Sequence, residues 1–246
     1  MKIIFLGTNG WYDTGTGNTI STLIDSKAGY IILDAGNGIY KATKYIKEDK
    51  PVYLFLSHFH IDHIEGLHTL VLFKFKDLKI IGQPGTKETL KEFLAPKYSV
   101  PLERLPYKTE VIEVDEGEHN KPFKFKCLKL KHVSSCFGFR FEIEDKIISY
   151  CTDTGYCKEA VELSEGADLA ILECAFESGQ EDPDWPHLNP EIAANMAKEA
   201  GAKKLALTHF DAYVYQTLGK RKEAEEKAKG IFKNSSVALD DLQLEI

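Results

Sequence analysis

Long apolar segments are absent from this sequence of 246 residues. The run at the start, Met1–Gly7, is far too short for a signal peptide or a membrane span. No later stretch reaches the roughly 18 apolar residues that a transmembrane helix needs. We therefore expect a protein that does not enter a membrane and that resides in the cytoplasm.

Cysteine is also scarce, and its spacing shows no pairing pattern. The five cysteines contain no CxxC pair. Reduced and mostly buried thiols are the expected state for such a set. Cys151 and Cys157 flank an acidic residue, Asp153, so they remain minor candidates for a metal or redox role.

Positively charged residues are fewer than negatively charged ones: the chain has 31 Lys and Arg and 38 Asp and Glu, which gives a formal net charge of −7. This balance argues against broad, non-specific attraction to nucleic acid, although it leaves room for a local basic patch. No linker and no internal repeat is evident. We therefore predict one domain spanning residues 1–246, which is long enough to bury a core without disulfides.

Strands and helices alternate along most of the chain. Apolar, β-branched runs that end in Gly, Asn or Asp predict strands at 2–6, 20–25, 30–34, 52–56, 78–82, 168–173, 203–208 and 236–240. Amphipathic stretches predict helices at 38–48, from about 62 to 71, and at 86–94, 157–164, 190–200 and 219–231. Alternation between 109 and 151 favours antiparallel strands with one wet face. Two sheets with outer helices are the simplest architecture.

Four ligand-type side chains, His58, His60, Asp62 and His63, follow directly on the predicted strand 52–56. Neutral imidazole and carboxylate suit Zn²⁺, with Mn²⁺ or Fe²⁺ as alternatives. The arrangement can split its ligands, with His58 and His60 on one metal and Asp62 and His63 on a second. A His-rich surface turn is the alternative, but it explains one or two such residues rather than four.

Three more candidate ligands, His132, Asp153 and His209, each stand where a predicted strand ends. Taken alone, such a residue is more often part of a turn or a helix cap. Together with the cluster at 58–63, they supply enough ligands for a two-metal site bridged by one carboxylate. We therefore predict that these residues converge at one edge of the sheets.

This ligand set resembles that of the metallo-β-lactamase superfamily over nearly the whole chain. The resemblance implies an α/β fold, the αββα four-layer sandwich, and an enzyme that depends on two divalent metal ions. It also implies a division of the ligands: His58, His60 and His132 on one metal, Asp62, His63 and His209 on the other, and Asp153 bridging. Asp62 is counted among the candidate catalytic residues as well.

Further segments resemble the ribonuclease Z branch of this superfamily: Phe5–Thr8, Leu33–Gly38, His132–Arg140, Leu172–Phe176 and Pro186–Leu188. This likeness implies that Asp34 orients a ligand histidine. It also implies that His187 is catalytic, as a cation or proton donor beside the attacked phosphoryl group. A loop histidine beside Trp185 is the alternative interpretation.

The chain also departs from this branch. Asp153 follows His132 by only 21 positions, where bacterial ribonuclease Z enzymes carry a long arm that grips tRNA. Thr152 replaces the usual Gly, and Ile61 replaces a small residue. A small, cyclic or nucleotide-type phosphodiester is therefore favoured over pre-tRNA, with RNA kept as a possible substrate. A homodimer is a further expectation from the family.

We thus predict a dinuclear hydrolase that attacks a phosphodiester with a metal-bridging hydroxide. One alternative is a thioester or lactone hydrolase of the glyoxalase II type, and another is a non-catalytic metal-binding protein on the same fold. Asp211 and Tyr213 are expected either to touch substrate or to form a turn. The remaining features are assigned to ordinary structure: His68, His119, the glycine turn 15–17 and the charged helix face 220–227.

Overall fold

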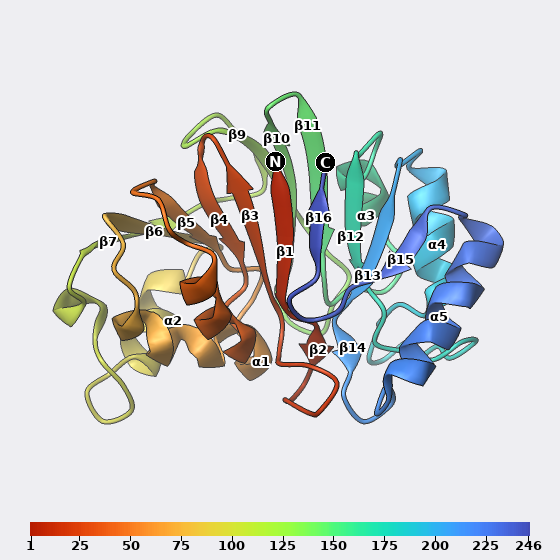
Figure 1. Cartoon of the computed structure of the whole chain (residues 1–246), viewed down its shortest axis with the longest axis horizontal. Coiled ribbons are helices and arrows are strands. Elements are labelled where there is room, and N and C mark those ends of the chain that lie inside the picture. The colour runs from red at the N-terminus through yellow and green to blue at the C-terminus, as the bar shows by residue number, and fades with distance from the viewer.

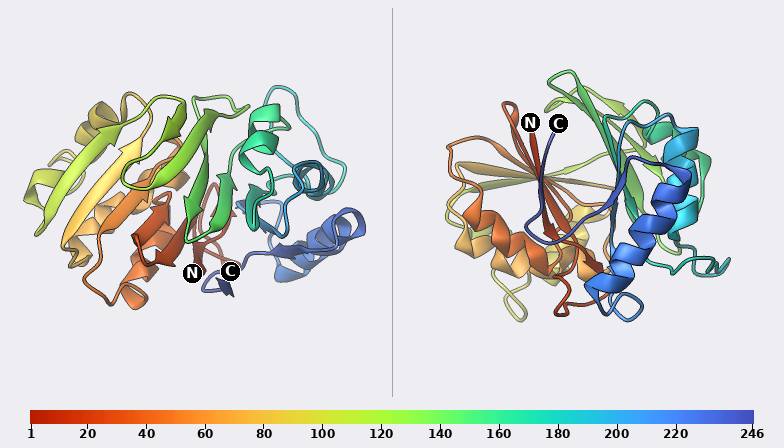
Figure 2. Two further views of the ribbon diagram at one scale, coloured as in Figure 1. Left: turned by 90° about the horizontal axis from the view of Figure 1, so that it is seen from above. Right: turned by 45° about the vertical axis from the view of Figure 1, so that its right-hand side comes forward.

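The computed structural model describes all of residues 1–246, and it places two central sheets between two layers of helices (Figure 1; Figure 2, right). This arrangement confirms the α/β class and the four-layer αββα sandwich. The strands are β1 (Lys2–Gly7), β2 (Asn9–Gly10), β3 (Ser21–Ser26), β4 (Gly29–Leu33), β5 (Val52–Phe55), β6 (Asp77–Gly82), β7 (Lys108–Glu113), β8 (Gly117–His119), β9 (Lys124–Lys129), β10 (Phe137–Ile143), β11 (Lys146–Cys151), β12 (Leu169–Glu173), β13 (Leu205–Thr208), β14 (Phe210–Asp211), β15 (Ser235–Val237) and β16 (Gln243–Glu245).

The helices cover the outer faces of the sheets. The α-helices are α1 (Ile61–Ile64), α2 (Thr86–Phe93), α3 (Lys158–Leu163), α4 (Pro190–Glu199) and α5 (Leu218–Ile231), and the 3₁₀ helices are η1 (Asn37–Lys44), η2 (Glu65–Leu72) and η3 (Leu102–Arg104). None of them combines the length and the apolar character that crossing a bilayer requires. That residues 1–246 form a single domain stays a prediction.

The two large sheets follow one plan. The first has the order β16-β1-β3-β4-β5-β6-β7, antiparallel from β16 to β4 and parallel from β4 to β7. The second has the order β15-β13-β12-β11-β10-β9-β8, parallel from β15 to β11 and antiparallel beyond. The short β2 pairs with β14, so it ties the start of the chain to the C-terminal half. Parallel strands end at one edge of each sheet, which is where loops build sites.

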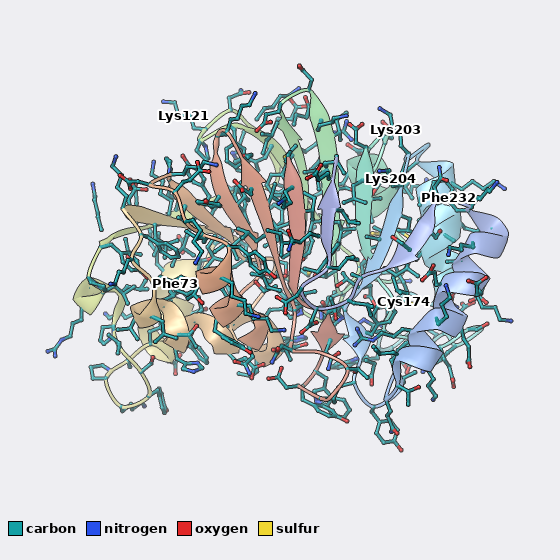
Figure 3. All side chains as sticks on the ribbon, viewed as in Figure 1. Phe73, Lys121, Cys174, Lys203, Lys204 and Phe232 are labelled. Atoms are coloured by element: carbon teal, nitrogen blue, oxygen red, sulfur yellow. The ribbon has the colours of Figure 1, made fainter.

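Three apolar cores hold the layers together. Between the sheets, the ring of Phe55 lies edge-on to three others, with centroids 5.0–5.3 Å away, those of Phe125, Phe139 and Phe141. Each sheet also packs against its own helices through one further core. Cys174, labelled in Figure 3, belongs to the core under α4 and α5. Because β5 is anchored on both faces, the chain that follows it leaves the sheet at a fixed point.

The helices predicted at 38–48 and 62–71 are present, as η1 and as α1 with η2. They are largely 3₁₀ in character, because backbones approach too closely there for a regular α-helix: a Cβ on Gly66 would lie 2.1 Å from the carbonyl oxygen of Gly36. One prediction of local structure was wrong. Strand β7 is parallel to β6, not antiparallel, whereas β8 to β11 are antiparallel as predicted. The short, polar β16 was not anticipated. The start of α4 is confirmed, since Asn189 Oδ1 accepts a hydrogen bond from the amide of Ile192.

Candidate metal centre

The seven predicted ligands meet at one edge of the two sheets, near α1, β2 and β14 at the bottom of Figure 1. They follow β5, β9, β11 and β13 or lie in α1, so both sheets contribute. Their ligand atoms form two groups, each with all atoms within 4.8 Å of one another: His58, His60, His132 and Asp153 in the first group, and Asp62, His63 and His209 in the second group. Within each group the structure brings together the side chains that the resemblance assigns to one metal, with Asp153 in the first group, and their roles as metal ligands stay a prediction.

Asp153 lies between the two groups. Its Oδ1 is 3.9 Å from Nε2 of both His58 and His132. Its Oδ2 is 2.9 Å from Nε2 of His63 and 3.2 Å from Nε2 of His209. A carboxylate in this position can share one oxygen with each group, which is the geometry of a bridging ligand.

The chemistry of these donors fits divalent cations. Nδ1 of His63 donates to Oδ2 of Asp34 at 2.9 Å, so the lone pair of the neutral ring lies on Nε2. That atom faces the Asp153 carboxylate and lies 3.1 Å from Nε2 of His209. In the first group, Nε2 of His58 is buried without a hydrogen-bond partner. Buried lone pairs that converge in this way repel one another unless a proton or a cation lies among them.

Burial sets the protonation of the first group. It lowers the pKa of His132 to about 4 and that of His58 and His60 below the ordinary histidine value. These rings are therefore neutral near pH 7. Neutral imidazole is the form that binds a metal, so this group needs to release no proton first.

Charge sets the protonation of the second group. Burial opposes the charged forms of His63 and His209, but nearby carboxylates, Asp153 foremost, outweigh it and raise the pKa of both rings. Burial likewise opposes ionisation of Asp62, yet His63 and His209 hold the pKa of that carboxyl well below its usual range. A proton and a cation therefore compete for the second group.

Asp34 supports the second group from behind. Its side chain is fully buried and accepts hydrogen bonds from the Ser57 amide (2.7 Å), the Ser57 hydroxyl (2.8 Å) and the Tyr150 hydroxyl (2.8 Å), besides His63. These contacts fix the ring of His63, in agreement with the orienting role expected for Asp34. Asp34, Asp153 and His209 also share left-handed backbones, with φ of 56°, 52° and 51°, a conformation that costs roughly 1–2 kcal/mol each and tends to cluster at functional sites.

His187 lies beside the first group, with its ring centroid 5.6 Å from that of His132. Its Nδ1 donates to Oε1 of Glu173 at 2.8 Å. Burial works against a charged ring, but the Glu173 carboxylate outweighs it and raises the pKa of His187 to about 9. His187 is therefore a cation at neutral pH, as its expected role requires.

Glu173 lies in the segment Leu172–Phe176 that resembles the ribonuclease Z branch, but no role was predicted for it. Its buried carboxylate accepts hydrogen bonds from the backbone amides of Thr154 (2.5 Å), Leu188 (3.2 Å) and Ala175 (3.2 Å), besides the one from His187. A glutamate at the end of a strand that is otherwise apolar was the available signal, since an acid is seldom buried without partners.

A cavity of about 530 Å³ opens onto both groups, and His187, Asp62 and Asp211 line it. No lysine or arginine lines it. Asp211 also forms a turn, because its Oδ1 accepts hydrogen bonds from the amides of Tyr213 and Val214, whereas its contact with substrate stays a prediction. Tyr213 does not line the cavity. Two lining residues that the sequence analysis missed are Gly10 and Trp11.

The other residues singled out from the sequence lie elsewhere. Cys151 is buried in the apolar core beneath α3 and α4, and the glycine turn 15–17 does not line the cavity. His68 is exposed, and His119 stacks on Phe125 with centroids 4.7 Å apart. The prediction of a wet face over 220–227 was wrong at two positions, because Arg221 and Ala224 are buried. Arg221 donates hydrogen bonds to Thr8 and Asn9, and Ala224 belongs to the core under α4 and α5.

Comparison with known proteins gives the following matches. A family model described as "Beta-lactamase superfamily domain" matches residues 30–210. A protein named ribonuclease Z from Acaryochloris marina (strain MBIC 11017) is 27% identical, over 100% of this chain and 98% of its own length. The probable metallo-hydrolase YhfI of Bacillus subtilis (strain 168) is 29% identical, over 94% of this chain and 95% of its own.

Solved structures give the same picture of the fold. The crystal structure of YhfI matches with a TM-score of 0.79 at 27% identity and covers 100% of this chain and 98% of that one. A crystal structure titled as a new diphosphatase from the PhnP family matches with a TM-score of 0.75 at 18% identity and covers 100% and 97% of the two chains. These likenesses extend over the entire chain, including the loops that carry the seven ligands.

Proposed function

The chain belongs to the beta-lactamase superfamily, and on that premise we propose that it is a metal-dependent phosphodiesterase with two divalent ions. The observation that carries the proposal is the position of His187, a cationic acid on the wall of the cavity onto which both ligand groups open. The relatives named ribonuclease Z and metallo-hydrolase support a metal-dependent hydrolase without specifying its substrate.

We assign His58, His60 and His132 to one ion, Asp62, His63 and His209 to the other, and Asp153 to both. Zn²⁺ is the favoured metal for imidazole and carboxylate donors, with Mn²⁺ or Fe²⁺ as alternatives. When bound, such ions lower the pKa of water toward neutrality and offset the charge on a phosphoryl oxygen. We also assign Asp62, which lines the cavity, a catalytic role as the acceptor of a proton from the attacking water.

His187 supplies the proton that the leaving group needs. Because Nδ1 is engaged by Glu173, the proton on Nε2 is the one available to substrate. A sugar alkoxide is a poor leaving group, because its alcohol is a much weaker acid than a thiol. A thiolate leaves readily, because a thiol has a pKa of about 8.5. A general acid therefore favours a phosphodiester over the thioester of the alternative hypothesis.

Three observations favour a small phosphodiester over pre-tRNA. The cavity has no lysine or arginine to follow a polyanion. The interval between His132 and Asp153 holds only the hairpin of β10 and β11. Finally, the alignment with ribonuclease Z of A. marina spans 308 positions against 246 residues here, so at least 62 of its positions face gaps in this chain. The alignment with YhfI needs only 241 positions.

The test is a parallel assay of the protein loaded with Zn²⁺ or Mn²⁺. Bis-p-nitrophenyl phosphate and 2′,3′-cyclic AMP should be hydrolysed, S-lactoylglutathione should not, and pre-tRNA should be cut poorly or not at all. Hydrolysis of the thioester alone would overturn the proposal in favour of a glyoxalase-type enzyme. A metal-loaded protein inert toward all four would support the non-catalytic alternative.

A further inference from the structure

Both tryptophans of this chain, Trp11 and Trp185, line the cavity beside the candidate metal centre. Their exposed fractions are 66% and 52%. A large apolar side chain gains little from folding when it stays in solvent, and exposed apolar surface at a cavity is typical of a place where a ligand binds. The stability of the fold alone therefore does not explain their positions.

Trp11 is held in place by the second ligand group. It has a left-handed backbone with φ of 73°, which is strained for a bulky residue, and its amide donates to Oδ2 of Asp62 at 2.7 Å. The preceding Gly10 packs against His209 so closely that a Cβ would lie 2.6 Å from that ring. The side chain is thus fixed at the rim by its own backbone, although it buries little surface there.

Trp185 is held at the rim next to the first ligand group. Oδ1 of Asp182 accepts its amide at 3.2 Å, and Pro186 follows it and packs against Gly155. The indole plane is parallel to the ring of His60, with centroids 6.4 Å apart. The two indoles therefore stand next to different ligand groups and border the same cavity.

We propose that Trp11 and Trp185 form an aromatic subsite that binds a flat aromatic substituent, of the nucleobase type, carried by one ester group of the substrate. This inference rests on the proposed phosphodiesterase function and narrows its substrate class to nucleotide-type esters. Indole faces bind any base by stacking and need no sequence-specific hydrogen bonds. A long nucleic acid is disfavoured as the occupant, because no lysine or arginine lines the cavity to follow its backbone.

The test compares two probes that share a ribose phosphate: AMP, which carries adenine at C1′, and ribose 5-phosphate, which carries a hydroxyl there. Titration calorimetry on the metal-loaded full chain should give AMP an affinity at least about tenfold higher, within the range known for base–aromatic stacking. AMP should also quench the tryptophan emission. Trp11→Ala and Trp185→Ala should each weaken AMP binding about tenfold and leave ribose 5-phosphate unchanged, while Trp→Phe should restore part of the loss.

Tyr213→Ala is the matched control, because Tyr213 is an aromatic residue that is also 66% exposed but does not line the cavity. Its AMP affinity should equal that of the unaltered protein. Thermal unfolding of each variant, together with the emission of the tryptophan that remains, reports whether the fold is kept.

Equal affinity for the two probes, or AMP binding that both alanine variants retain in full, overturns the aromatic subsite; so does the absence of AMP binding. Hydrolysis of bis-p-nitrophenyl phosphate would leave the proposed function intact in each of these cases. Conversely, tryptophan-dependent AMP binding by a protein that hydrolyses no phosphodiester supports the subsite and removes the proposed function.

Discussion

The two sheets form the two walls of the site, and each carries a buried carboxylate behind a histidine, Asp34 on the first sheet and Glu173 on the second. Asp34, which follows β4, accepts a hydrogen bond of 2.9 Å from Nδ1 of His63. Glu173, the last residue of β12, accepts one of 2.8 Å from Nδ1 of His187. Both acids are fully buried, and each accepts three further hydrogen bonds. The two sheets thus carry the same carboxylate–imidazole pair at the same kind of strand end.

The surroundings of the other ring nitrogen distinguish the two pairs. Nε2 of His63 is enclosed by the lone pairs of Asp153 and His209, so its position suits a cation. His187 borders the open cavity, so its proton is available to a substrate. A carboxylate behind a histidine therefore fixes the ring and its charge but does not decide its chemistry. The group in front of the ring decides it.

The largest effect is expected for His63→Ala. Loss of this ring should remove metal from the second group and reduce phosphodiester turnover about 10⁴-fold, since metal ions stabilise the transition state by several kcal/mol. Metal content by atomic absorption and turnover of 2′,3′-cyclic AMP are the measurements. His68→Ala, an exposed histidine five positions away, is the control and should change neither. A His63→Ala protein with full metal content would contradict the distinction between His63 as a metal ligand and His187 as an acid.

His187→Ala should keep its metals and lose turnover about 10²- to 10³-fold on 2′,3′-cyclic AMP, which expels an alkoxide. The loss should be much smaller on bis-p-nitrophenyl phosphate, whose phenolate leaves without protonation. A merely structural role would reduce both rates equally. Full turnover of the cyclic substrate by this variant would exclude His187 as the acid.

Asp34→Asn should weaken metal binding by about 10- to 100-fold, the usual effect of losing a partner that orients a ligand histidine. Competition with a chromogenic chelator measures this affinity, and thermal unfolding checks that the buried site still folds. Glu173→Gln is the matched substitution on the other wall and should leave metal affinity unchanged. Equal losses in both variants would show that the two carboxylates do not have separate tasks.

The sequence predicted those parts of the site that depend on residue type at strand ends. His58 and His209 stand where apolar runs stop, and the carboxyl ends of parallel strands meet at one edge, so their convergence could be inferred. The positions of Gly10 and Trp11 at the rim could not be predicted, because they depend on the pairing of β2 with β14, about 200 residues away. The 3₁₀ character of η1 and η2 could not be predicted for a similar reason, since it arises from the close approach of Gly36 to Gly66 rather than from local periodicity.

The smallest effect is expected for Glu173→Gln, and it should appear only in the pH dependence. The active form of His187 is protonated, so with a pKa of about 9 it keeps its proton through neutral pH and loses it as the pH rises past that value. Without the carboxylate, burial dominates and the pKa falls to or below the ordinary value of about 6.5. Turnover of 2′,3′-cyclic AMP should then change little below pH 6 but fall about tenfold or more at pH 8, as the alkaline limb moves to lower pH. If the limb does not move, Glu173 holds the His187 ring in position without setting its charge, and the two walls resemble each other more closely than we infer.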